Sequence, residues 1–129
     1  MITLIKALEY RLAVPGKPES FRSRKSKDFR EKIKKYAELI IHEPIIKGVE
    51  IYVDYFHRRN RKMDMDNISK NVLDALNGIA YKDDRQVKNQ NSRAHDIRNI
   101  ITITDLPLDA VKPLKEWDEY IFIRIREIN

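Results

Sequence analysis

The sequence contains no cysteine, few glycines and a single tryptophan, and it has no apolar stretch of the length that a membrane-spanning helix needs. The absence of cysteine excludes disulfides, thiolate zinc sites and cysteine nucleophiles, so any metal must be held by oxygen or imidazole ligands. A spanning helix takes about 18 or more consecutive apolar residues. The apolar residues at the amino terminus instead alternate with charged ones, unlike the core of a signal peptide. We therefore expect a soluble, cytoplasmic protein.

The positive charge of the chain is concentrated in two segments. At 129 residues the chain is long enough for one domain with a hydrophobic core and too short for two ordinary ones. Its formal net charge is +6, but residues 17–35 hold nine Lys or Arg against three acids, and residues 57–62 hold four more cations and no acid. These two segments carry about +10, so the rest of the chain carries about −4. This distribution indicates an anionic partner.

The first half of the chain predicts two strands with a basic helix between them. Apolar residues alternate over residues 2–14 and again over 49–55, as half-buried strands require. Over residues 28–42 they follow helical spacing, and the opposite face of that helix is strongly basic. Residues 15–27 contain two prolines and a glycine and are expected to form a loop. That loop carries Arg22, Arg24 and Lys25.

The second half carries a helix with two separate stripes over residues 66–77. One stripe is apolar and is predicted to be buried. The other is polar and contains, at steps of four, four and three residues, Asp66, Lys70, Asp74 and Asn77. The dipeptide Asn77-Gly78 is typical of a helix end. Strands are expected over residues 87–95, 100–104 and 120–128, with a loop or short helix over 105–118.

These elements together predict an α/β (α+β) fold. We expect a single compact domain over residues 1–129, in which a mixed β-sheet of about four to five strands packs with two main helices. The sequence shows no internal repeat and no low-complexity tract.

Four carboxylates flank the second helix and lie close to the basic segments: Asp64, Asp66, Asp83 and Asp84. Carboxylate oxygens are the ligands that Mg²⁺ prefers, with water and substrate phosphate completing the shell. Asp64 and Asp66 can share one ion. Because the helix is about 18 Å long, Asp84 can join them only if the chain after Gly78 folds back along it. Lys70 lies one turn beyond Asp66, where its ammonium can reach a phosphate oxygen.

Each part of this cluster also has a purely structural interpretation. Asp and Asn at a helix start serve as N-caps, and Lys70 with Asp66 is also an ordinary salt bridge of a few tenths of a kcal/mol. An EF-hand does not fit, because Ile68, Ser69 and Ala75 stand where it needs an oxygen ligand, glycine and glutamate. Carboxylates beside basic segments do suit phosphodiester hydrolysis, in which cations hold the backbone and metal ions activate water.

The run from Asp64 to Val87 closely resembles the signature of the RusA Holliday-junction resolvases. That signature is an Asp-x-Asp-Asn-x-x-Lys helix with Asp-x-Leu, followed by an Asp-Asp-x-Gln-Val turn. Gly16-Lys17-Pro18 with Arg22 and Arg24 is also similar to the family's basic loop, and the chain length is similar. Two departures stand out: Arg85 replaces a residue that is commonly small, and the 105–118 segment is longer than needed to reach the last strand.

The resemblance implies a homodimeric endonuclease that binds four-way DNA junctions and nicks two strands symmetrically, in DNA recombination and repair. It implies Mg²⁺ as the cofactor, which Mn²⁺ can replace, and a bacterial or phage origin. The residues it implies as catalytic are Asp64, Asp66, Lys70 and Asp84. The implied metal ligands are Asp64, Asp66 and Asp84, with Asp83 as a neighbouring candidate. The basic segments then become DNA-binding candidates, namely Arg22, Arg24, Lys25, Arg58, Arg59 and Arg61.

Two other functions remain open from the sequence. One is a DNA-binding module without catalysis, in which the aspartates are caps and salt-bridge partners. The other is a metal-dependent nuclease that acts on flaps or on RNA. His57 ends a predicted strand beside arginines, where DNA contact or a surface position is favoured over a proton-shuttling role.

Overall fold

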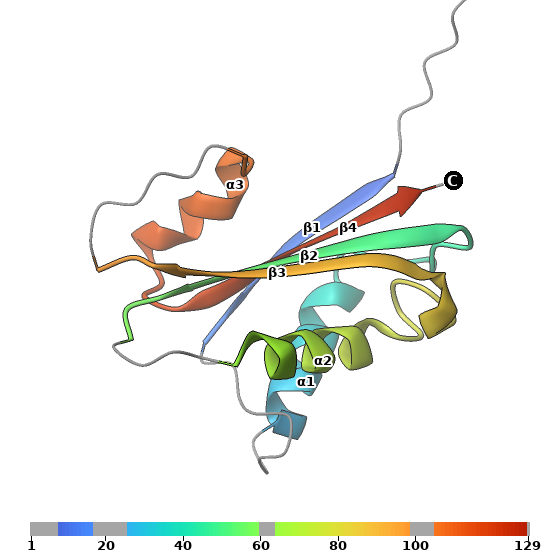
Figure 1. The fold of residues 1–129 in the computed structure, drawn as a ribbon, viewed down its shortest axis with the longest axis horizontal. Coiled ribbons are helices and arrows are strands. Elements are labelled where there is room, and N and C mark those ends of the chain that lie inside the picture. The colour runs from blue at the N-terminus through green and yellow to red at the C-terminus, as the bar shows by residue number, and fades with distance from the viewer. Residues whose placement is uncertain (1–7, 17–25, 60–63, 99–104, 129) are drawn as a thin grey trace, which may run out of the picture.

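The protein is an open four-stranded sheet with two main helices on one face (Figure 1). The computed structural model describes residues 8–16, 26–59, 64–98 and 105–128. The strands are β1 (Glu9–Pro15), β2 (Gly48–His57), β3 (Val87–Asp96) and β4 (Tyr120–Ile128). The helices are α1 (Ser26–Glu38), α2 (Met65–Leu76) and the short α3 (Leu108–Val111), with 3-10 turns η1 (Asp84–Gln86) and η2 (Lys112–Lys115). No helix in the described ranges is long and apolar enough to cross a membrane.

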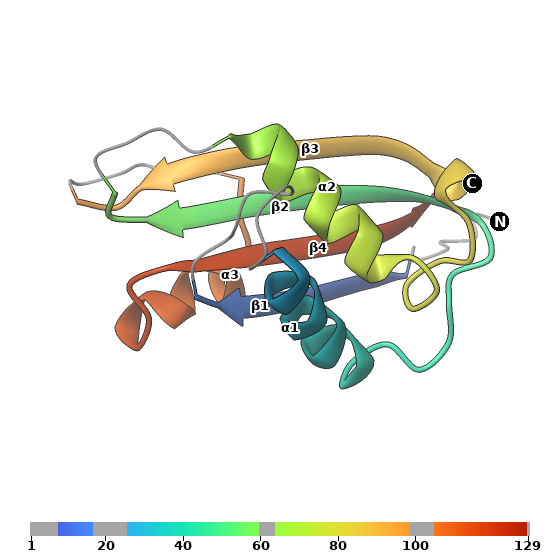
Figure 2. The same cartoon turned by 90° about the horizontal axis from the view of Figure 1, so that it is seen from below.

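The sheet is mixed, as the sequence predicts. Its strand order is β1-β4-β2-β3, with β4 antiparallel to both β1 and β2, and β3 parallel to β2. Parallel neighbours need a crossover, and α2 provides it between β2 and β3. The predicted α+β fold with two main helices is confirmed. Both α1 and α2 cover one face of the sheet, and α3 lies over one end of the other face (Figures 1 and 2).

The main core lies between the sheet and the two helices. Every second residue of β2 and β4 points into it, which follows from the period-2 alternation of a strand. From the strands come Val49, Ile51, Val53, Tyr55, Ile121, Ile123 and Ile125; from the helices come Phe29, Ile33, Ala37, Ile68, Val72, Ala75 and Leu76. A smaller cluster on the opposite face packs under α3 and contains Phe56, Ala110, Tyr120 and Phe122.

Several element boundaries differ from the sequence-based prediction. Helix α1 begins at Ser26 and ends at Glu38, and not at residues 28 and 42. It ends early because the chain must turn before Pro44 and also bring Ile41 and Ile45 into the core, where they are 5% and 2% exposed. Pro15 is part of β1, which an edge strand tolerates because one side of its backbone needs no partner strand.

The amino-terminal strand is confirmed only in part. Residues 1–7 lie outside the described residues, and Leu8, which alternation places on the buried side, is 42% exposed. Leu12 and Val14 are buried as expected. Most of the 15–27 loop and the predicted strand over residues 100–104 also lie outside the described residues. The remaining strands are confirmed, and the 105–118 segment forms α3 and η2.

The end of α2 is determined by local backbone geometry. The N–H of Asn77 bonds the carbonyl of Leu73 at 3.1 Å, and the Tyr81 hydroxyl donates to the same carbonyl at 2.7 Å. Gly78 then takes a φ of 89°, in the region that L residues with a Cβ rarely adopt. The predicted Asn-Gly helix end is confirmed, and it turns the chain sharply toward the second pair of acids.

Gln86 ties the turn with these acids to the segment before β2. Its side-chain amide donates to the carbonyls of Ile45 at 2.7 Å and Lys47 at 2.8 Å. Its side-chain oxygen accepts from the N–H groups of Lys82 at 2.9 Å and Asp83 at 3.0 Å. All four hydrogen-bonding positions of one amide are therefore used across two chain segments. This clamp sets the position of the acidic turn relative to the sheet.

Leu76 tests how far α2 depends on its buried stripe. Because Leu76 is fully buried, Leu76→Ala is expected to lower the free energy of unfolding by about 2–5 kcal/mol, through lost transfer energy and a cavity. Leu39→Ala removes the same atoms from a residue that is 76% exposed, so it should cost less than about 0.5 kcal/mol. Urea unfolding of both variants measures the difference. Equal effects would show that α2 does not depend on this packing.

Gln86→Ala tests the clamp. Loss of its four hydrogen bonds is expected to lower the free energy of unfolding by about 2–6 kcal/mol, at a net value of about 0.5–1.5 kcal/mol for each bond. Amide exchange at Lys82 and Asp83 should accelerate at least about tenfold in hydrogen-exchange measurements. Lys82→Ala is the matched control, because only its backbone takes part in the clamp. Unchanged exchange in Gln86→Ala would refute the clamp.

Candidate active site

The polar stripe of α2 faces solvent, opposite its buried stripe. Asp66, Lys70, Asp74 and Asn77 are all exposed, at the spacing that places them along one side of the helix. Helix α2 begins just after Asp64, whose carboxylate accepts the N–H of Asp66 at 3.0 Å and the Asn67 amide at 2.8 Å. Asp64 is therefore the N-cap of α2. Its side chain remains exposed, and each carboxylate oxygen keeps a further acceptor position.

The two acids after α2 are held differently from each other. Asp83 caps η1 by accepting the Arg85 N–H at 2.8 Å, and it also pairs with the Arg85 guanidinium at 2.9 Å. Hydrogen bonding from the Arg85 side chain lowers the pKa of Asp83 to about 2. Asp84 has no such arginine partner among the described residues. Its Oδ1 accepts a hydrogen bond from the Asn77 side-chain amide at 2.9 Å. Asp83 is thus engaged in an ion pair, whereas Asp84 is directed toward α2.

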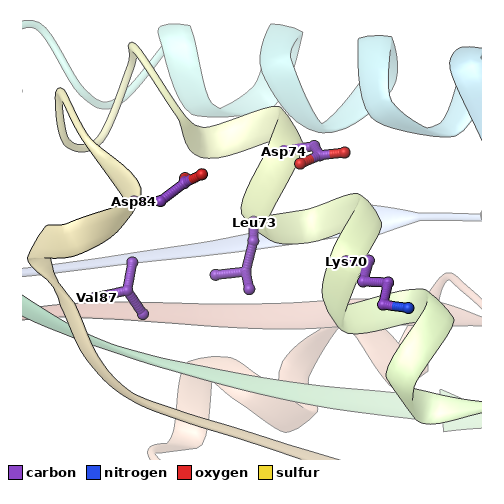
Figure 3. Close-up of a pocket in the computed structure, with 5 residues that line it drawn as sticks. All are labelled: Lys70, Leu73, Asp74, Asp84 and Val87. Atoms are coloured by element: carbon purple, nitrogen blue, oxygen red, sulfur yellow. The ribbon is translucent and has the colours of Figure 1, made fainter.

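A pocket of about 250 Å³ lies between α2 and the turn that carries Asp84 (Figure 3). Leu73 and Val87 form its apolar part, and the charged residues around it are Lys70, Asp74 and Asp84. In Figure 3 the Asp84 carboxylate points toward α2, from the opposite side of the pocket to Lys70. Two carboxylates and one ammonium line the pocket, and in Figure 3 the Asp74 and Lys70 side chains extend away from Asp84.

The structure does not bring Asp84 to Asp64 and Asp66 within one chain. Asp84 is bonded to Asn77, and the eleven residues from Asp66 to Asn77 correspond to about 16 Å along the helix. The chain does fold back along α2, but it does so in β3, which follows Asp84 in the sequence. Asp84 itself therefore stays at the end of α2. Among the described residues, no three His, Asp or Glu side chains gather as a group that could hold a metal ion. The donor type fits Mg²⁺, and the roles of the individual aspartates stay predictions.

The basic residues after β2 are partly tied to the fold. Arg59 forms a forked pair with Glu119, at 2.8 Å and 3.1 Å, and the buried Tyr55 hydroxyl donates to the same carboxylate. Arg58 is more exposed and lies 3.4 Å from Asp118. The other DNA-binding candidates lie outside the described residues, namely Arg22, Arg24, Lys25 and Arg61.

The surface position that the sequence favours for His57 is wrong. Its side chain stacks on the Tyr55 ring at 4.9 Å, and its Nδ1 accepts the Arg59 N–H at 3.1 Å. The residue is only 8% exposed. His57 therefore holds the backbone of Arg59, at the start of the basic segment, through this hydrogen bond.

Sequence reasoning missed two features of the site. Asp74 is exposed and Asn77 ends α2, as their positions on the stripe predict, but the sequence did not indicate that Asp74 also lines the pocket and that Asn77 holds Asp84. Their regular spacing with Lys70 was the signal available in the sequence. On the other face of the sheet, Asp54 is buried among charged side chains of β3 and β4. An acid in the middle of a mainly apolar strand was the sign of it in the sequence.

Comparison with known proteins identifies the family. The model of the family described as "Endodeoxyribonuclease RusA" matches residues 11–104, which include α1, α2, β2 and β3. No curated protein sequence matches the chain. The family match spans most of the 129 residues and contains the polar stripe of α2 together with the Asp83-Asp84 turn. The protein therefore belongs to the RusA family of endodeoxyribonucleases.

Proposed function

We propose that this protein is a Mg²⁺-dependent endonuclease that resolves four-way DNA junctions by paired symmetric nicks, in DNA recombination and repair. The observation that carries the proposal is the polar stripe of α2, which is exposed along its whole length and has Asp84 bound at its end. Membership of an endodeoxyribonuclease family supports the chemistry. The excess of basic residues in two segments supports a DNA substrate.

The role proposed for each residue follows from the contacts that its side chain makes. Asp64, Asp66 and Asp84 are the metal ligands, because each is exposed and retains free acceptor positions. A bound Mg²⁺ or Mn²⁺ supplies Lewis-acid stabilisation of charge on the scissile phosphate. Lys70 binds a phosphate oxygen of the substrate. Asp83 contributes less, because its carboxylate is already paired with Arg85.

A homodimer would bring Asp84 of one copy close to Asp64 and Asp66 of the other. Asp64 and Asp66 lie at the start of α2 and Asp84 at its end, on a stripe that faces solvent. If two copies of the chain pair with their α2 helices antiparallel, Asp84 of each copy comes to the start of α2 in the other. Such an interface is two-fold symmetric, so it creates two equivalent sites. Two sites match two symmetric nicks.

The basic segments are proposed to bind the DNA backbone beside these sites. Arg58 and Arg61 precede Asp64 along the chain, and Arg22, Arg24 and Lys25 precede α1. Arg59 is proposed to have a structural role instead. Its guanidinium is paired with Glu119, and this pair anchors the basic segment to the fold. Phosphate contacts of this kind position a duplex without reading its sequence.

Two observations favour a rival function, a DNA-binding module without catalysis. Asp64 caps α2 and Asp83 pairs with Arg85, so both have structural roles of their own. In that case the acidic residues contribute to stability and the basic segments alone bind DNA. Cleavage assays separate this function from the proposed one.

A substrate panel tests the proposed function directly. With Mg²⁺ present, the protein is expected to nick a synthetic four-way junction in opposite strands, at least about tenfold faster than duplex, flap or RNA substrates. The reason is that two symmetric sites can act together only on a branched substrate. Gel assays of one preparation on all four substrates, with and without EDTA, measure this preference. Faster cleavage of any other substrate would end the resolvase assignment, and binding without cleavage would favour the rival.

Mixed variants test the metal ligands and the two-copy arrangement together. Asp66→Asn and Asp84→Asn should each reduce junction cleavage by more than about 100-fold, a larger loss than residues that only orient metal ligands cause, while junction binding persists. Mixing the two after co-refolding should restore nicking, because each heterodimer then has one site with both aspartates intact. Asp109→Asn, on α3 across the sheet, is the control and should keep full activity.

The outcomes of that experiment are separable. An active single variant would remove that aspartate from the proposed ligands. Inactive single variants whose mixture stays inactive would contradict the two-copy arrangement and leave the ligand roles standing. Loss of DNA binding together with cleavage would indicate a folding defect, which thermal unfolding of the same preparations reveals.

A further inference from the structure

The sheet face opposite α1 and α2 contains a polar pocket that has no part in the proposed active site. Its volume is about 200 Å³, and it lies where β2, β3 and β4 run side by side. The charged residues that line it are Asp54, Arg93, Asp105, Arg124 and Arg126. Figure 1 shows that α2 lies on the other side of the sheet and that α3 lies over one end of this face only. The pocket is therefore separated from the acidic stripe by the full thickness of the sheet.

Strand register brings these residues together from distant parts of the chain. Arg124 and Arg126 alternate along β4 with residues that enter the main core, so both point to the opposite face. Arg124 is the register partner of Tyr52 on β2, and Asp54 is the register partner of Arg93 on β3. A cluster of charge in mid-sheet is costly unless its members are paired.

The two acids of the pocket are mostly satisfied by Arg93 and His95. Asp54 is only 1% exposed, and its Oδ1 accepts the Arg93 Nε at 2.9 Å and lies 2.7 Å from His95 Nε2. Arg93 also pairs with Asp105 at 3.0 Å. The remaining oxygen of Asp54 is 3.7 Å from Arg124 Nη2, which is longer than a hydrogen bond.

Arg124 is the member of the cluster that lacks a complete set of partners. Its side chain is 12% exposed, and its Nε is buried with no hydrogen-bond partner within the described part of the chain. The Arg124 guanidinium carbon lies 5.0 Å from the centre of the Tyr52 ring. This cation–π contact orients the guanidinium plane and leaves its N–H groups available for hydrogen bonds. A buried charged donor without an acceptor is unfavourable by itself. The geometry leaves a fixed guanidinium that needs an acceptor.

We infer that the pocket around Arg124 is a second anion site, which binds a phosphate group. The guanidinium presents its donors as a planar fork that matches phosphate oxygens. Arg93 pairs with both lining acids and Arg126 donates to Glu9 at 3.1 Å, so Arg124 is the lining arginine whose Nε has no partner within the described residues. A phosphate has four oxygens and can accept from the Arg124 guanidinium and the Asn91 amide, which also lines the pocket, at once, whereas a carboxylate has only two. The phosphate belongs to a nucleic-acid backbone or to free phosphate, and this inference does not depend on the proposed nuclease activity.

Side-chain NMR of the arginine Nε–H groups tests the site without any cleavage step. The protein is titrated at constant ionic strength and without Mg²⁺, first with inorganic phosphate and then with a short DNA duplex that lacks terminal phosphates. A saturable shift of the Arg124 Nε–H resonance is expected with phosphate. Arg124→Lys keeps the charge but removes the fork, so it should weaken phosphate binding at least about tenfold. Arg98→Lys is the matched control, because Arg98 is exposed, is already paired with Asp96 and does not line the pocket.

The two ligands distinguish the sources of the phosphate group. A shift with both inorganic phosphate and DNA supports a backbone phosphate, and a shift with inorganic phosphate alone supports a free anion. No shift of Arg124 with either ligand would overturn the inference. Unchanged affinity in Arg124→Lys would overturn it as well, because binding would then occur elsewhere. The titration of the unmodified protein keeps the test valid even if Arg124→Lys folds poorly.

Discussion

Packing of α2 against the sheet is the interaction on which the rest of the molecule depends. The apolar stripe of this helix is buried against β2 and β4 and against α1, which fixes the rotation of the helix about its own axis. Once that rotation is fixed, the polar stripe must face outward. Every proposed catalytic group either lies on this stripe or precedes it as a cap, or is bonded to its end, as Asp84 is through Asn77. The arrangement of the proposed catalytic groups therefore depends on the core packing of the same helix.

The aspartates of the proposed site also have structural roles. Asp64 starts α2 and Asp83 starts η1, each as an N-cap that accepts backbone N–H groups. A cap is an efficient way to position a metal ligand, because its hydrogen bonds fix the carboxylate while leaving acceptor positions free. Gln86 likewise positions acidic residues through hydrogen bonds to the backbone. All four hydrogen bonds of its side-chain amide hold the turn with Asp83 and Asp84 to the fold. The site is thus held by backbone contacts, and changes in sequence at these positions affect stability and chemistry together.

The two faces of the sheet differ in where their charged side chains lie. On the helix side, charged groups are exposed on α2 and the interior is mainly apolar, with Ser26, Ser69 and Asn71 as buried polar residues. On the other side, arginines and acids lie within the sheet itself, and the Nε of Arg124 has no hydrogen-bond partner among the residues that the structure describes. A four-way junction is a bulky substrate with several arms, and a protein with cationic groups on both faces has more than one place to hold phosphate. The Arg59–Glu119 pair shows, in contrast, that an arginine near the site can serve the fold alone.

Local patterns in the sequence determined the element types and the family. The period of apolar residues specified α2, β2 and β4, because side-chain direction in a helix or strand depends only on spacing along the chain, whereas β3 is a polar and weakly marked strand. The Asn77-Gly78 end was readable for the same reason, since it depends on backbone preference at two adjacent residues. The motif from Asp64 to Val87 was sufficient to indicate the family that the comparison then showed.

Tertiary structure alone decided which separate segments meet. The position of Asp84 depends on how the chain turns after Gly78 and on the clamp of Gln86, so its distance from Asp66 could not be read from spacing. The burial of His57 and the pairing of Arg59 with Glu119 depend on β2 lying beside β4, contacts between residues about sixty positions apart. The Arg124 pocket likewise exists only because strand register places three strands together. Spacing along the chain encodes direction, but only packing of the whole chain sets which distant side chains share one space.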